Sequence, residues 1–136
     1  MMTNGSVCVM RDDRPLASLG EVTPLEIGDF PLILLGSGRR WRSQVEKAFG
    51  SMDRRPCVAI ETHTHGSACA LVARGLGMAI LNEQLAQPYL HKPLVARPFS
   101  PEILHEYAFA VSSLSPPSRL TAAFREAARE YFARSR

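Results

Sequence analysis

The stretch Ala59-Ile-Glu-Thr-His-Thr-His-Gly-Ser-Ala-Cys-Ala-Leu-Val-Ala-Arg-Gly-Leu-Gly-Met-Ala-Ile-Leu81 decides the fold of this chain. It predicts a strand, a polar turn, a helix and a second strand. Residues 57–60 are apolar and β-prone, which favours the first strand. Ala68, Leu71 and Val72 fall at the spacing of one helical face, so we expect that face to be buried.

The end of this stretch predicts the C-terminus of the helix and a second strand after it. Gly75 stands where a helix-terminating glycine is expected. Residues 78–81 form a short apolar run, which is typical of a buried parallel strand. The whole stretch therefore predicts a right-handed βαβ unit.

Strand-to-helix turns supply the candidate binding residues. A second such turn follows the apolar strand predicted at residues 31–35. Ligands of open α/β sheets bind at the carboxyl ends of the strands, where helix N-termini also favour anions. Hydroxyl groups at these turns either cap the helices or contact a ligand, and the two roles are compatible. The candidate residues are Gly36, Ser37, Gly38, Thr62, His63, Thr64 and His65.

The remaining sequence alternates predicted strands and helices, which indicates an α/β fold with a mostly parallel sheet. Thr23, Pro24 and Glu26 have the spacing of a capping box that opens a short helix, and Gly28 ends it. A longer helix has an apolar stripe and ends at Gly50. The stripe consists of Trp41, Val45, Ala48 and Phe49. Asn82 is expected to cap a short helix ended by Pro88, and the remaining predicted strands are residues 6–10, 94–97 and 107–111.

The last predicted helix, opened by Pro116 and Pro117, is strongly amphipathic. Its polar face mixes arginine with glutamate, which favours packing on a core or another subunit over lying on a membrane surface. Its apolar face consists of Leu120, Ala123, Phe124, Ala127, Ala128 and Tyr131.

Composition indicates one ordinary globular domain. The chain has 136 residues, 46% of them hydrophobic and 21% charged, with a net charge of +3. No run of about 18 apolar residues occurs, and residues 1–6 are too polar for a signal peptide, so we expect a cytoplasmic protein. Cys8, Cys57 and Cys69 are interpreted as reduced core thiols. The basic runs at residues 39–42 and 54–55 are interpreted as solvated surface.

Catalysis and metal binding are the disfavoured alternatives. His65 and Cys69 lie four residues apart on one predicted helix, but the set with His63 and Cys57 matches no common zinc spacing. A Cys69–His65 pair lacks an evident oxyanion site and a third, orienting residue. We therefore expect no enzymatic activity, no metal and no cofactor.

Three segments in order resemble the effector-binding domain of LysR-type transcriptional regulators. The first is Glu61-Thr-His-Thr-His65 followed by Cys69-Ala-Leu-Val-Ala-Arg-Gly-Leu-Gly-Met-Ala-Ile-Leu-Asn82. The second is Val7-Cys-Val-Met-Arg-Asp-Asp-Arg-Pro-Leu-Ala17, with Arg14 where the family usually has histidine. The third, Leu94-Val-Ala-Arg-Pro-Phe-Ser-Pro-Glu-Ile103, is similar to the branch that includes lysine-biosynthesis and opine-catabolism regulators.

The resemblance implies a periplasmic-binding-protein type II-like fold with a Rossmann-like lobe and helices on both faces of the sheet. Residues 1–136 would form a single partial effector-binding domain, in which residues 11–100 are the second lobe. Residues 1–10 and 101–136 would supply the crossover strands and the closing strand and helix of an incomplete first lobe. The family's DNA-binding domain has no counterpart in these residues.

The resemblance also implies a function. The chain would sense a small amino-acid-like or carboxylate metabolite at the candidate residues named above and form a homodimer or larger homo-oligomer. DNA would be contacted only through a domain missing from this chain. The alternatives are a structural or dimerisation module that senses nothing, and a stand-alone small-molecule binding protein.

We expect no sequence-specific DNA binding by the 136-residue chain. A recognition helix is not identified, and a net charge of +3 attracts phosphates only weakly. Gel-shift titrations at physiological salt check this expectation. Tight, sequence-selective retardation would contradict it.

Overall fold

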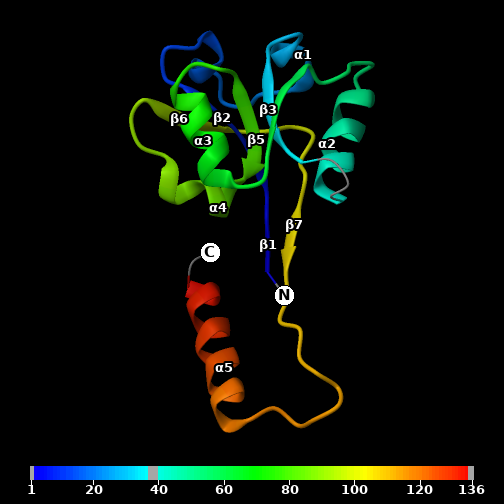
Figure 1. Cartoon of the computed structure of the whole chain (residues 1–136), viewed down its shortest axis with the longest axis vertical. Helices are drawn as coiled ribbons and strands as arrows, with labels where there is room; N and C mark the ends of the chain where they lie inside the picture. The colour runs from blue at the N-terminus through cyan, green and yellow to red at the C-terminus, as the bar shows by residue number, and fades with distance from the viewer. Residues whose placement is uncertain (1, 37–39, 135–136) are drawn as a thin grey trace. The chain divides into compact units, whose positions relative to one another are not determined.

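The computed structural model describes residues 2–36 and 40–134, which fall into two compact units. The larger unit is Asn4–His105, and the smaller unit combines Met1–Thr3 with Glu106–Arg136. The described elements are shown in Figure 1. In chain order they are β1 (Met2–Asn4), β2 (Ser6–Arg11), η1 (Pro15–Ser18), α1 (Pro24–Ile27), β3 (Leu32–Leu35), α2 (Arg40–Gly50), β4 (Val58–Thr62), α3 (His65–Ala73), β5 (Met78–Asn82), α4 (Glu83–Ala86), η2 (Gln87–Tyr89), β6 (Leu94–Pro98), β7 (His105–Tyr107) and α5 (Arg119–Arg134).

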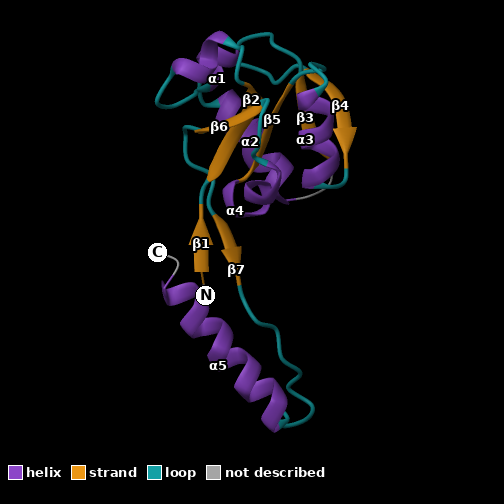
Figure 2. Ribbon diagram, turned by 90° about the vertical axis from the view of Figure 1, so that its left-hand side faces the viewer, coloured by secondary structure: helices purple, strands orange, loops and turns teal. Residues whose placement is uncertain are grey.

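The larger unit is built on a five-stranded sheet with the order β4-β3-β5-β2-β6 (Figure 2). β3 pairs in parallel with both β4 and β5, whereas β2 pairs antiparallel with both β5 and β6. Within the described sheet, four strands therefore run in one direction and β2 runs in the other. The predicted α/β class is confirmed, and the sheet is mixed because β2 enters it without a preceding crossover helix. β1 and β7 form a separate two-stranded sheet.

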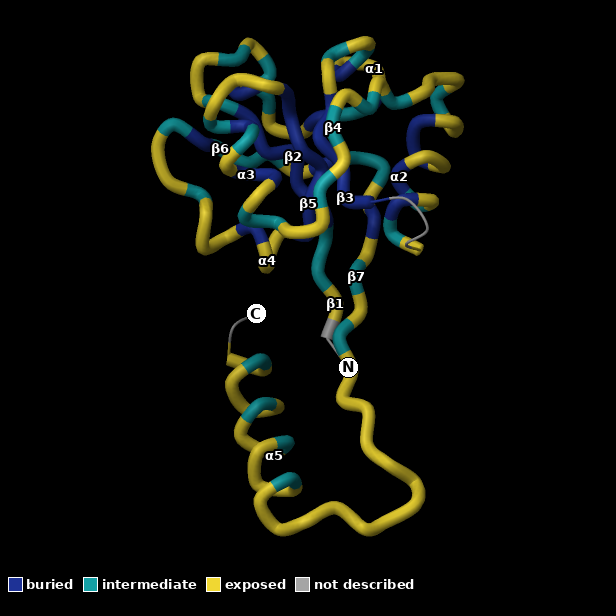
Figure 3. The backbone as a smooth tube through the Cα atoms, viewed as in Figure 1, coloured by how far each residue is buried: buried dark blue, intermediate teal, exposed yellow. Residues whose placement is uncertain are grey.

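Both faces of the five-stranded sheet are covered, with α2 on one side and α3 on the other (Figure 1). Side chains alternate along each strand, so β3 sends Leu32 and Leu34 to one face and Ile33 and Leu35 to the other. Figure 3 shows the resulting buried centre in dark blue. The α2 face includes Cys8, Met10, Val45, Ala48, Phe49, Met78 and Ile80, and the α3 face includes Val7, Val9, Ala68, Cys69, Val72, Ala79 and Leu81.

The predicted helix signals near Thr23 and Gly75 are confirmed. Thr23 forms the capping box with Glu26, whose Oε2 accepts the Thr23 backbone N–H at 2.7 Å. At the end of α3, Gly75 takes a positive φ of 81° and its N–H donates to the Val72 carbonyl at 2.9 Å. The next N–H, from Leu76, donates to the Leu71 carbonyl at 3.2 Å. These two bonds form a Schellman motif, which requires a residue that tolerates positive φ.

The interpretation of all three cysteines as core thiols is wrong for Cys57, which is exposed. Cys57 precedes β4, and β4 has a single neighbour in the sheet, so its residues alternate between half-buried and exposed. Cys8 and Cys69 are buried as predicted, and burial raises the pKa of the Cys8 thiol to about 12 and that of Cys69 to about 11. The apolar run before the polar turn is therefore an edge strand.

The C-terminal segment departs from the predicted strand at residues 107–111. β7 ends at Tyr107, and residues 108–111 lie outside any strand. α5 begins at Arg119, where the Thr121 N–H donates to the Ser118 hydroxyl at 3.1 Å. The predicted apolar face of α5 is exposed, with Phe124 at 63% of its full accessibility (Figure 3). Among the described helices, none is long and apolar enough to cross a membrane.

Substituting Gly77 with alanine is expected to destabilise the fold. A Cβ there would lie 2.6 Å from the backbone oxygen of Pro31, and that oxygen already accepts the Met78 N–H at 3.0 Å. Since backbone cannot yield as a flexible side chain does, we expect Gly77→Ala to lower the free energy of unfolding by about 1–3 kcal/mol in urea titrations. The matched control is Gly20→Ala, whose Cβ would meet nothing within 4 Å. Equal stability of the two variants would contradict the packing at Pro31.

Candidate functional site

One edge of the sheet collects the polar ends of several strands. β3, β4 and β5 run in the same direction, so they end together at Leu35, Thr62 and Asn82. β2 runs the other way and begins at this edge, where Ser6 pairs with Asn82. We call this the carboxyl edge. It is the place where open α/β sheets bind ligands.

The structure brings together the two turns that the sequence singles out. The Gly36 N–H donates to the Thr62 carbonyl at 2.9 Å, which joins the end of β3 to the end of β4. A Cβ at Gly36 would lie 3.3 Å from the His63 imidazole, so glycine permits this close approach. Ser37 and Gly38, also predicted, lie outside the described residues.

Thr64 acts as the N-cap of α3, one of the two roles considered for the turn hydroxyls. Its Oγ1 accepts the Ser67 N–H at 3.1 Å, and the Thr64 hydroxyl donates to the Ser67 Oγ at 2.8 Å. Thr62 is the last residue of β4, and His65 is the first residue of α3. The predicted turn therefore lies at the carboxyl edge, on the side of the edge strand β4.

The carboxyl edge also contains Ser6, Trp41 and His105, which the sequence did not single out. The Ser6 hydroxyl lies 2.8 Å from the His105 Nε2 and 3.2 Å from the Ile103 carbonyl oxygen. The Trp41 ring stacks on the His105 imidazole, with centroids 6.3 Å apart and planes at 27°. No local pattern predicts this cluster because Ser6 and His105 are 99 residues apart.

Trp41 carries a buried donor that no described residue accepts. Its indole Nε1 is inaccessible to solvent and has no hydrogen-bond partner. Leaving a buried donor unpaired costs about 1–3 kcal/mol. An acceptor atom that reached Nε1 after a local rearrangement would remove that cost.

His105 is held in an environment that disfavours its charged form. Burial lowers the pKa of the imidazole, and the charge of nearby His65 lowers it further. The second effect requires the two imidazoles to lie close enough to repel each other when protonated. An anion bound beside them would reverse this repulsion and favour protonation.

Arg42 holds the end of β3 through a hydrogen bond to the Leu35 carbonyl. Its guanidinium is buried, which corrects the interpretation of residues 39–42 as solvated surface for this residue. One nitrogen, Nη1, donates to the Leu35 carbonyl at 3.1 Å and to Glu61 at 3.2 Å, and Nε donates to Glu46 at 3.2 Å. Arg42 is buried because these acceptors satisfy its charge, and it ties α2 to β3 and β4.

Asn82 holds Asn4, the last residue of β1, against the carboxyl edge. Its side-chain amide exchanges two hydrogen bonds with that of Asn4, at 3.0 and 3.3 Å. Asn82 Oδ1 also accepts the Leu85 N–H at 3.1 Å, which confirms its predicted role as the N-cap of the short helix α4.

Several hydrogen-bond donors and titratable groups gather at the carboxyl edge. The groups gathered there include the Trp41 N–H, two imidazoles and the N-terminal turn of α3. No described group of three or more histidine, cysteine, aspartate or glutamate residues has the arrangement of a metal site. N–H donors of this kind can hydrogen-bond to the oxygen atoms of an anion.

Comparison with known proteins identifies a family that this sequence matches and solved structures that share its fold. The sequence matches the family described as "LysR substrate binding domain" over residues 1–133. The transcriptional activator protein LysR of Escherichia coli K12 is 28% identical over 127 residues, which cover 93% of this chain and 40% of that protein. The CcmR regulatory domain of Synechocystis PCC6803 in complex with 2-PG superimposes with a TM-score of 0.71 at 19% identity, covering 92% of this chain and 61% of that chain. The effector-binding domain of QuiR in complex with shikimate superimposes with a TM-score of 0.69 at 15% identity, covering 97% of this chain and 63% of that chain.

The two solved structures show the shared fold, and the relative is a regulator by name. The chain spans about 40% of the length of the E. coli protein that it matches.

His105 predicts a pH dependence of stability. At pH values above the usual histidine pKa of about 6.5, the imidazole is neutral in both the folded and the unfolded state. Its protonation then has no effect on the free energy of unfolding. As the pH falls below that value, the unfolded chain takes up the proton more readily, so the free energy of unfolding falls until the lowered folded pKa is passed. We expect His105→Gln to lose less stability between pH 7.5 and 5.5 than the wild type, as measured by urea denaturation. The control is His91→Gln on the exposed surface, which should keep the wild-type dependence. If His105→Gln also keeps that dependence, the proposed environment of His105 is wrong.

Proposed function

The chain belongs to the LysR substrate-binding domain family, and from this premise we propose that its carboxyl edge binds a small anionic or zwitterionic effector of a LysR-type regulator. The observation that carries the proposal is the buried Trp41 N–H, which has no acceptor and stands beside His105. A carboxylate oxygen placed there accepts this hydrogen bond and lies next to the imidazole pair. We assign DNA contact to polypeptide outside these 136 residues, because the matched relative is more than twice as long.

Several groups support a carboxylate over a neutral ligand. A bound anion offsets the repulsion between His65 and His105. The α3 N-terminus adds backbone N–H groups and the favourable end of the helix dipole. Of the predicted residues that the structure describes, we assign effector contact to Gly36, Thr62, His63 and His65, and Ser37 and Gly38 stay candidates from the sequence alone. We also assign effector contact to Thr64, whose hydroxyl caps α3, because capping and ligand contact are compatible.

We assign the effector to the amino-acid-like carboxylates. The sequence resemblance to regulators of the lysine-biosynthesis and opine-catabolism branch supports this class. The QuiR domain in complex with shikimate supports a carboxylate ligand in this fold.

The position of His105 suggests how binding is transmitted. His105 is the last residue of the larger unit, and the chain continues from it into the smaller unit. An effector that contacts His105 and Ser6 therefore acts on the segment that connects the units. Its differential affinity for two arrangements of this segment would shift their populations.

Dimerisation is the second part of the proposal, and it is supported by α5. Three large side chains of this helix are exposed: Leu120 at 80%, Phe124 at 63% and Tyr131 at 66%. Phe109, at 45%, packs edge-on against Phe124 with centroids 5.9 Å apart. An apolar face of this kind marks an interface. We propose that a second copy of the chain covers it, and this face is also what a purely structural module would use.

We expect amino-acid-like carboxylates to raise the melting temperature in a thermal-shift panel. A ligand present at 100 times its dissociation constant stabilises the fold by about 2.7 kcal/mol. Amino-acid amides of the same side chains are the matched controls, since they lack the carboxylate. Trp41→Phe keeps the ring stacking and removes the N–H, so it should weaken the response. If sugars or neutral aromatic compounds stabilise the fold and amino acids do not, the proposed effector class is wrong.

Light scattering at micromolar concentration should report at least twice the 15.0 kDa mass of the chain. Phe124→Asp should dissociate the assembly because it places a charge in the apolar face. Ala122→Asp introduces the same charge two residues away, on the other side of the helix, and should leave the assembly intact. A wild-type monomer, or equal effects of the two variants, would contradict dimerisation through α5.

A further inference from the structure

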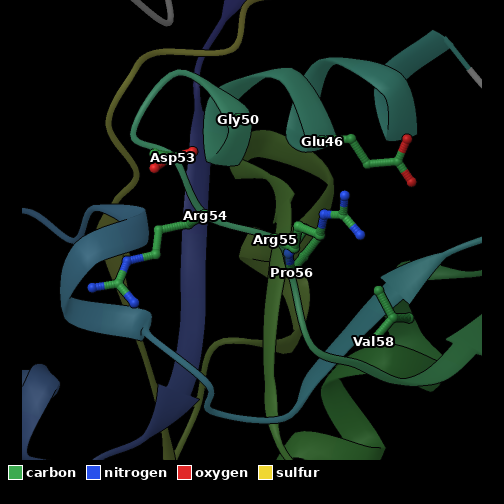
Figure 4. A pocket seen from close by; sticks show the side chains of 7 residues that line it. All are labelled: Glu46, Gly50, Asp53, Arg54, Arg55, Pro56 and Val58. Atoms are coloured by element: carbon green, nitrogen blue, oxygen red, sulfur yellow. The ribbon is translucent and has the colours of Figure 1, made fainter.

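A hollow lies at the end of β4 that is away from the carboxyl edge. Its volume is about 540 Å³, within the range of small-molecule sites. It is formed where α2 ends and the chain turns into β4 (Figure 4). We call it the α2–β4 groove, and its lining residues are Glu46, Gly50, Asp53, Arg54, Arg55, Pro56 and Val58.

The walls of this groove carry charges of both signs, and the Glu46 carboxylate already contacts Arg42 through one oxygen. Figure 4 shows the Arg55 side chain extending toward Glu46, whereas Arg54 extends in the opposite direction. No ion pair within the described residues joins Arg55 to Glu46, so more than 4 Å separates their charged atoms. Val58 and Pro56 are half-buried and add apolar surface to the lining.

The groups that face each other are set on fixed backbone. Glu46 is held by Arg42, whose Nε donates to Glu46 Oε1 at 3.2 Å. The turn before Arg55 is closed by two hydrogen bonds, from Asp53 N–H to the Gly50 carbonyl and from Arg54 N–H to the Phe49 carbonyl, both at 3.0 Å. The positive φ of 55° at Asp53 completes this tight turn. The backbone of the groove therefore needs little ordering before a ligand enters, whereas the exposed Arg55 side chain becomes ordered on binding.

We propose that the α2–β4 groove is a second ligand site, which takes a zwitterion whose carboxylate and ammonium groups are joined by a short apolar stem. The carboxylate pairs with the Arg55 guanidinium and the ammonium pairs with the Glu46 carboxylate. The stem lies over Val58 and Pro56. A simple anion fits less well, because the guanidinium groups of Arg54 and Arg55 diverge and cannot clamp one anion between them.

The probe that tests this site is 6-aminohexanoate, titrated into the ¹⁵N-labelled chain and followed by backbone amide shifts. We expect saturable shifts at Gly50, Asp53 and Val58. Hexanoate lacks the ammonium group and hexylammonium lacks the carboxylate, so each should bind about tenfold more weakly because it loses one charge-assisted contact.

Single-residue variants assign the contacts. Arg55→Gln and Glu46→Gln should each weaken the binding of 6-aminohexanoate by about tenfold. The control Arg74→Gln makes the same charge change as Arg55→Gln on an exposed residue outside the groove, and it should leave binding unchanged. The proposal is overturned if no saturable shift occurs at the groove, if hexanoate binds equally well, or if Arg55→Gln binds like the wild type. Trp41→Phe should have no effect on these amides, so failure of the carboxyl-edge site and failure of the groove are told apart.

Discussion

Burial of β3 and β5 on both faces is the constraint on which the larger unit depends. All four residues of β3 and all five of β5 are buried, so each face of the sheet must be covered by a helix. Transfer of each leucine or isoleucine side chain out of water contributes about 1.5–3 kcal/mol. With α2 and α3 occupying the faces, the polar ends of the strands remain open only at the edges of the sheet. The candidate site follows from that arrangement.

Arg42 transmits this packing to the candidate site. Its buried charge requires acceptors, and it finds them in Leu35, Glu46 and Glu61. The first turn of α2 is thereby fixed against the end of β3, and its neighbour Trp41 is placed on the His105 ring. Glu46 accepts a hydrogen bond from Arg42 and also lines the α2–β4 groove. One buried guanidinium therefore contacts elements of both proposed ligand sites.

The features predicted from the sequence are those with a local cause. Thr23 and Glu26, or Gly75 at the end of α3, act within a few residues, and the buried strand at residues 78–81 needs only its own composition. The binding role assigned to the seven turn residues stays a prediction. Features that depend on distant partners were missed: Cys57 is exposed because β4 is an edge strand, and Ser6 meets His105 across 99 residues. Arg42 was assigned to the surface because two of its acceptors, Leu35 and Glu61, lie on other elements, β3 and β4, which no pattern around Arg42 reveals.

The central claim is that an effector carboxylate accepts the buried N–H of Trp41, and one NMR signal tests it directly. Trp41 is the only tryptophan in the chain, so its indole N–H gives a single resonance. On titration with an amino acid that stabilises the fold, this resonance should move downfield and saturate together with the melting temperature, because a charge-assisted hydrogen bond forms. If the ligand saturates the protein while the indole resonance stays in place, the effector binds elsewhere and the account is contradicted.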